Sequence, residues 1–140
     1  MAYCTPADVT TIALPASAIP SGITLAQQQA ACNDASSSAD AKMRARYPLP
    51  ITGSIGGGPG VFDPSIVRYT AYMAAYIIMS FRGFNPSSAA DRMIVENNEK
   101  AIAWFDGVER GNVHPDVTVT QPAPPTYQLP QIISKRPRGI

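Results

Sequence analysis

The order of apolar and polar residues between positions 24 and 47 predicts a first long helix. Thr24 and Gln27 stand three residues apart, as in a capping box whose hydroxyl and amide satisfy two backbone N–H groups at a helix start. We expect the helix to end before Pro48, because the residue preceding a proline avoids helical angles. Mostly small residues form its apolar side, which lets a neighbour approach closely. That side is made of Leu25, Cys32, Ala35, Ala39, Met43 and Tyr47.

A second helix is predicted over about 64–82. Asp63 followed by Pro64 is a strong helix start, with a carboxylate at the cap and proline at the first helical position. Gly83 suits the left-handed residue after its end. Apolar residues lie on nearly all sides of this helix, which places it in the middle of a bundle. They include Ile66, Tyr69, Met73, Ala74, Tyr76, Ile77, Ile78 and Met79.

A third helix is predicted over about 88–110, roughly 34 Å long at about 1.5 Å per residue. Its packing stripe alternates steps of four and three residues. Trp104 lies off this stripe, so it either covers the edge of the bundle or contacts a neighbouring subunit. The acidic residues of this helix indicate a solvated face with local ion pairs, such as Asp106 with Arg110. The stripe consists of Ile94, Asn98, Ala101, Phe105 and Val108.

Two other segments are expected to be less regular. Residues 1–23 contain Pro6, Pro15 and Pro20, which indicates a short helix or turn followed by a loop. Residues 51–61 contain five glycines and are predicted to form a glycine-rich loop. This loop lacks the Gly-Lys-Ser/Thr ending of a phosphate-binding loop, so we do not expect nucleotide binding.

The chain changes character after Gly111. Residues 117–120 alternate like a short β segment, and four prolines lie among the eleven residues 121–131. The predicted fold class is therefore mainly α, a three- to four-helix bundle with a glycine-rich loop and a long extended C-terminal arm. The predicted division is 1–23, 24–113 for the bundle and 114–140 for the arm.

Composition favours one domain, because 140 residues with 45% hydrophobic content support a single core. The net charge of +1 is unevenly distributed. Up to Asp116 there are 8 basic and 10 acidic residues, and after it 3 basic and none acidic. A DNA-binding body should instead carry a clustered basic face. No apolar run is long enough for a membrane span and no secretory signal is present, so we expect synthesis in the cytoplasm.

No group of residues indicates catalysis. The sole histidine, His114, stands in a connecting segment without a nucleophile motif. Cys4 and Cys32 lack metal-ligand spacing and are expected to be half-buried free thiols. We therefore expect neither an enzyme nor a bound cofactor or metal.

The C-terminal arm is too apolar for a merely solvated tail, although a disordered tail is the alternative. Its apolar residues could fill pockets on a partner, and its basic residues could meet acidic side chains. We therefore predict a docking peptide. Its candidate binding residues are Tyr127, Leu129, Ile132, Ile133, Lys135, Arg136, Arg138 and Ile140.

Several motifs occur together in a characteristic order. They are the start AYCTPADV at 2–9, ADAKMRARYPLPI at 39–51, the apolar helix after Asp63-Pro64, and NEKAIAWFDGVERGNV at 98–113. In this order the chain resembles the head-to-tail connector, or adaptor, proteins of tailed bacteriophages, in their small helical Mu-like form. The resemblance covers residues 2–113.

The resemblance implies a structural protein of the virion neck, made in the host bacterial cytoplasm. It implies a twelve-fold ring of this chain below the portal protein, with a further neck or tail protein as partner and DNA only passing through the channel. The arms would then clasp the portal or adjacent subunits. The alternative is a small DNA-packaging or regulatory protein that binds nucleic acid through Lys42, Arg44, Arg46 and the basic tail.

Overall fold

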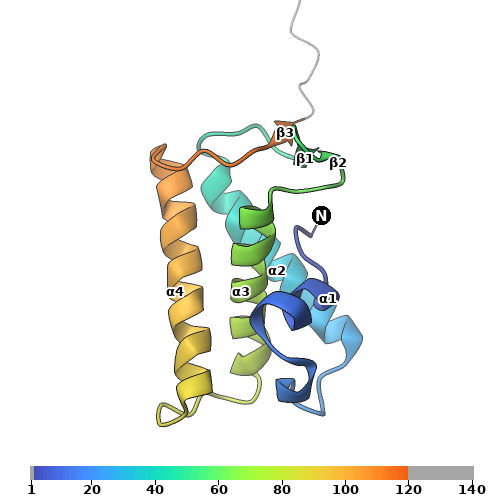
Figure 1. Cartoon of the computed structure of the whole chain (residues 1–140), viewed down its shortest axis with the longest axis vertical. Helices are drawn as coiled ribbons and strands as arrows, with labels where there is room; N and C mark the ends of the chain where they lie inside the picture. Colours follow the sequence, from blue (N-terminus) through green and yellow to red (C-terminus); the bar gives the residue numbers. More distant parts are fainter. Residues whose placement is uncertain (1, 120–140) are drawn as a thin grey trace, which may run out of the picture.

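Three long helices stand side by side in the computed structural model, which describes residues 2–119 (Figure 1). They are α2 (Leu25–Met43), α3 (Pro64–Ser80) and α4 (Ala89–Arg110). A short N-terminal helix, α1 (Pro6–Asp8), continues into a π-helical turn, η1 (Val9–Ala13), and a 3-10 turn, η2 (Ala16–Ala18). The mainly helical fold class predicted from the sequence is confirmed.

The helix boundaries follow from capping residues that the sequence displays. The Thr24 side chain accepts from Gln27 N at 3.2 Å, and the Gln27 side chain accepts from Thr24 N at 2.8 Å, which completes the capping box. Asp63 caps α3, with Pro64 at its first position. α2 ends at Met43, before the expected end at Tyr47. Both Arg46 N and Tyr47 N donate to the Met43 carbonyl, so the chain tightens into a turn ahead of Pro48.

The core surrounds α3, as its all-round apolar sequence predicts. On α2, small residues including Ala35 and Ala39 are fully buried, so the two helices can pack closely. α4 contributes the apolar members of its predicted stripe, whereas Asn98 is only half-buried. Phe105 of this stripe is the largest fully buried side chain in the described part of the chain. The residues that α3 buries are Ile66, Thr70, Ala71, Met73, Ala74, Ala75, Ile78 and Met79.

The N-terminal segment packs into the same core. Val9 and Leu14 are buried, and η1 lies against α3. The Tyr3 backbone N–H donates to the Ser36 hydroxyl at 2.8 Å, and the Tyr3 hydroxyl donates to the Asp40 carboxylate. Burial and the neighbouring Asp40 raise the pKa of Tyr3. Residues 2–19 thus cover a side of the bundle that α4 does not reach.

A small antiparallel sheet closes one end of the bundle, with strand order β2-β1-β3. Its strands are β1 (Ile51–Ser54), β2 (Gly58–Pro59) and β3 (Thr118–Val119). The short β segment predicted near 117–120 is confirmed. The prediction of a plain loop over 51–61 is wrong for the strand residues, because burial of Ile51 and pairing with β3 fix this stretch.

The Phe105→Ala variant should lose about 3–5 kcal/mol of unfolding free energy, because a large side chain is removed from the fully buried α4 contact. The measurement is urea unfolding followed by circular dichroism. Ile55→Ala removes an 81% exposed side chain and should change the free energy by less than about 0.5 kcal/mol. Equal losses in both variants would contradict this description of the core.

Candidate partner-binding surface

The segment from which the C-terminal arm departs is fixed to the sheet. From the end of α4 the chain crosses the top of the bundle, drawn in orange, to β3 (Figure 1). Thr118 and Val119 pair with Gly53 and Ile51, and the Thr52 hydroxyl donates to the Thr118 carbonyl at 3.1 Å. We call this end, comprising residues 51–61 and 114–119, the arm end.

Two aspartates hold the arm end together. The Asp116 carboxylate accepts from Ile55 N at 2.9 Å and from Gly56 N at 3.0 Å, in the turn between β1 and β2. Its own backbone N–H donates to Asp63 Oδ2 at 2.8 Å, while Asp63 Oδ1 accepts from Ser65 N at 2.7 Å. One network therefore joins the start of α3, the hairpin turn and the segment leading to the arm.

Basic residues of the first long helix and the turn after it hold the end of α4. Arg46 donates to the carbonyls of Glu109 at 3.1 Å and Arg110 at 2.8 Å. Lys42 Nζ lies 2.8 Å from Asp106 and 3.2 Å from Glu109. These two carboxylates raise the pKa of Lys42. The predicted pairing of Asp106 with Arg110 is wrong, because Asp106 faces α2 instead.

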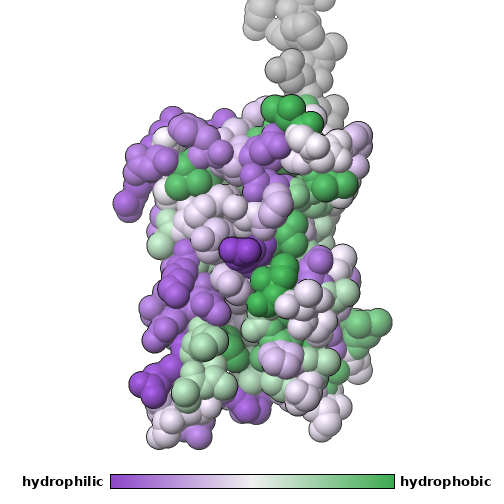
Figure 2. Space-filling model, viewed as in Figure 1, coloured by the Kyte–Doolittle hydropathy of each residue, from purple (hydrophilic) through white to green (hydrophobic). Residues whose placement is uncertain are grey.

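Apolar side chains are exposed at the arm end. Ile55 is 81% exposed and Val61 is 54% exposed. In Figure 2, apolar surface lies over this end and along the boundary with the N-terminal segment, whereas the side formed by α4 is mostly hydrophilic. The arm end thus offers both exposed apolar contact area and the departure point of the arm.

Trp104 is half-buried at the seam between α3 and α4. Its ring stacks on Tyr69 with centroids 5.0 Å apart and planes at 26°, and meets Phe105 edge-on. Of the two roles predicted for Trp104, covering the edge of the bundle is what the structure shows. A contact with a neighbouring subunit stays a prediction.

The predicted docking residues of the arm lie outside the described residues. They are Tyr127, Leu129, Ile132, Ile133, Lys135, Arg136, Arg138 and Ile140. The structure therefore places residues 114–119, the first part of the predicted arm, but not these side chains. Sequence reasoning missed Asp116, whose partners lie 53 to 61 positions away. The sequence identified Asp63 as a helix cap, but not the hydrogen bond that Asp63 accepts from Asp116 N.

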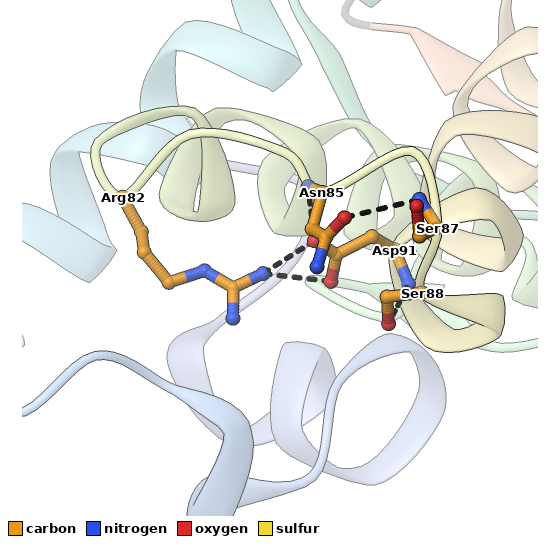
Figure 3. Close-up of polar contacts among 5 residues, drawn as sticks. All are labelled: Arg82, Asn85, Ser87, Ser88 and Asp91. Atoms are coloured by element: carbon orange, nitrogen blue, oxygen red, sulfur yellow. Dashed lines mark hydrogen bonds and ion pairs between the residues drawn. The ribbon is translucent and has the colours of Figure 1, made fainter.

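The opposite end of the bundle, which we call the loop end, comprises the α3–α4 connection and η2. Arg82 Nη2 donates to both Asp91 carboxylate oxygens, at 2.6 and 2.7 Å, and Asn85 N donates to Asp91 Oδ2 at 2.7 Å (Figure 3). The Asn85 bond, followed by that of Arg82, lowers the pKa of the buried Asp91. Ser88 accepts from Asp91 N at 3.4 Å and caps α4.

Within residues 2–119, no three His, Cys, Asp or Glu side chains gather as metal ligands would. His114 is exposed in the connecting segment. Cys4 and Cys32 are free and fully buried rather than half-buried, and a hydrogen bond to Cys32 together with burial raises the pKa of Cys4. None of the helices in this range combines the length and apolar character of a membrane span.

Comparison with known proteins gives one family. Residues 3–133 match the model of a protein family described as Bacteriophage Mu, Gp36. The match includes the helices, the sheet and most of the C-terminal segment. No curated protein matches the chain.

Gly53→Ala should open the arm end, because an added Cβ would overlap the Gly58 carbonyl oxygen and lie 3.1 Å from Gly60 N. We expect a loss of about 1–3 kcal/mol and faster hydrogen exchange at the Ile55 and Gly56 amides. Gly22→Ala is the matched control, since nothing lies within 4 Å of its Cβ position. Unchanged exchange in Gly53→Ala would contradict the described hairpin.

Asp91→Asn should destabilise the protein at pH 7 by removing the charge that Arg82 and Asn85 hold. Because the pKa of Asp91 is lower in the folded protein, its contribution is complete at neutral pH and is lost as pH falls below about 4. Thermal melts should therefore show a gap between wild type and variant that narrows from pH 7 to pH 3. A constant gap would contradict the lowered pKa.

Proposed function

Because the chain belongs to the Bacteriophage Mu Gp36 family, we propose that this phage protein is a structural adaptor of the virion. It would form a ring between the portal and the neck or tail and continue the DNA channel. The connector resemblance in residues 2–113 supports this role. The working parts would be assembly surfaces, with no catalytic step.

The observation that carries the proposal is the fixed departure of the arm. β3 is paired with β1, and Asp116 holds the adjoining hairpin turn through two backbone N–H groups. An apolar and basic segment of 21 residues follows Val119. A rigid departure point reduces the number of directions in which that segment can start, which lowers the ordering cost of docking it.

A ring makes weak arm contacts effective. Burial of one Leu or Ile side chain contributes about 1.5–3 kcal/mol before the cost of ordering the segment, so a single arm binds weakly. Once several copies are assembled, each further contact forms within one particle at a high effective concentration. The body up to Asp116, with 8 basic and 10 acidic residues, also suits a channel that DNA must leave.

Nucleic-acid binding, the alternative, has less support. This alternative was assigned three basic residues of the body and the basic tail. Of the three, Lys42 is paired with Asp106 and Glu109, and Arg46 donates to the end of α4. Using them for phosphates would break contacts that hold the helices together. Arg44 is exposed, so within residues 2–119 the body offers one free cation of the three, and phosphate binding would depend mainly on the three basic residues of the tail.

Quantitative peptide mass spectrometry of purified phage particles, calibrated against the major capsid protein, tests the proposal. We expect about twelve copies of the chain in each particle, because the connector resemblance implies a twelve-fold ring. Leu129→Asp with Ile132→Asp should reduce the copy number several-fold, because two apolar anchors become charged. Gln128→Asp with Gln131→Asp adds the same charge without removing an anchor and should leave the copy number near that of wild type.

Particles without the chain would overturn the adaptor role, and hundreds of copies would indicate a capsid or tail-tube component. In the first case, DNA binding that falls steeply with rising salt would favour the packaging or regulatory alternative.

A further inference from the structure

An apolar groove of about 670 Å³ opens at the loop end of the bundle. It lies where the η1–η2 connection meets the end of α3 and the start of α4. Met93 on its wall is 62% exposed. Methionine is a flexible apolar side chain, so an exposed one is well suited to packing against a partner. The residues that give the groove its apolar character are Leu14, Pro15, Met79, Ala90, Met93 and Ile94.

A second hollow, of about 430 Å³, adjoins the groove, and Asp91 lines both. We call it the acidic hollow, because Glu96 and Glu99 line it beside Phe84 and Val95. Arg82 already neutralises Asp91. Among the described residues, Glu96 and Glu99 have no ion pair, although Arg92 also lines the hollow. An apolar surface thus leads directly to unpaired negative charge.

The wall between these two hollows is rigid. Figure 3 shows Arg82, Asn85 and Ser88 converging on Asp91, so the α3–α4 connection is fastened to the first turn of α4. The groove is therefore formed before any partner arrives, which lowers the cost of binding.

We infer that this groove binds the C-terminal segment of a neighbouring copy of the chain. Leu129, Ile132 and Ile133 would lie in the apolar groove, and Lys135 and Arg136 would meet Glu96 and Glu99 in the acidic hollow. This inference rests on the proposed ring, and it names the surface that receives the arm.

The order of chemistry agrees on both sides. Along the segment, the apolar residues come first, and Lys135 and Arg136 follow three and four positions after Ile132. Along the surface, the apolar groove is followed by the acidic hollow. Apolar burial gives such a contact its affinity, and opposite charges fix its direction.

The arm is long enough to reach the groove of a neighbouring copy. The arm departs from β3 at one end of the bundle, and the groove lies at the opposite end, beyond the 22 residues or about 33 Å of α4 (Figure 1). The 21 residues after Val119 can span about 65 Å if extended, roughly twice that length. A contact between opposite ends of two copies is head-to-tail, and repeated head-to-tail contacts form a ring when the rotation between successive copies closes.

Photocrosslinking in assembled particles tests the inference. Met93 is replaced by p-benzoylphenylalanine in the full chain, and purified particles are irradiated. We expect a cross-linked species of about twice the 14.9 kDa chain mass, with the link mapped by mass spectrometry to residues 129–136. Ile102, exposed on the same helix and outside the residues that line the groove, is the matched position and should give few such links.

Charge reversal provides a second readout. Glu96→Lys with Glu99→Lys should lower the yield of the Met93 cross-link several-fold, and adding Lys135→Glu with Arg136→Glu should restore most of it. Asp34→Lys, which reverses an exposed charge on α2, should leave the yield unchanged.

Each other outcome decides against the inference. Links to the portal or another protein, links within one chain at monomer mass, or no links from Met93 would overturn it, while a chain present in about twelve copies would leave the adaptor role standing. Particles that lack the chain would overturn the adaptor role itself, and the ring contact with it.

Discussion

The structure depends on one constraint: α3 is apolar on nearly all sides and must be covered all round. It buries eight residues, from Ile66 to Met79. Two helices cannot enclose such a surface, so α2 and α4 share it with the N-terminal segment through Val9 and Leu14. Small residues on α2 allow α2 and α3 to pack closely. This packing stabilises α2, whose serine-rich middle has a modest intrinsic helix propensity.

The two ends of this core are completed by short carboxylates that accept backbone N–H groups. Asp63 and Asp116 join the hairpin, α3 and the departing chain at the arm end. Asp91 joins the α3–α4 connection to the start of α4 at the loop end. A carboxylate can accept several hydrogen bonds from backbone N–H groups that have no partner in a helix or strand. The irregular backbone at both ends of the bundle is therefore held in one arrangement. The fold thus presents a defined arm departure and a defined groove.

Local signals predicted the helices well, because periodicity and caps act within a few residues. The capping box at Thr24 and the Asp63-Pro64 start are confirmed. The hairpin was not foreseen, since five glycines argue for a loop while the pairing that orders them comes from residues 118–119. The partners of Lys42 and Asp116 were not predicted either, because they lie about 60 positions away in the sequence. For the candidate site, composition identified the arm as apolar and basic, and its predicted contacts remain untested.

Placing the arm and the groove at opposite ends has a consequence for assembly. If they faced each other on one molecule, each copy would satisfy its own arm and gain nothing from neighbours. In the contact we propose, the arm crosses the roughly 33 Å between the two ends and gains this apolar burial on a second copy. A closed ring leaves no arm and no groove without a partner, whereas an open row leaves one of each. In the proposed ring, closure would therefore add one more arm contact than an open row has, and each of these contacts is weak in a single pair of copies. Such a ring would suit the proposed adaptor, which would assemble on the portal.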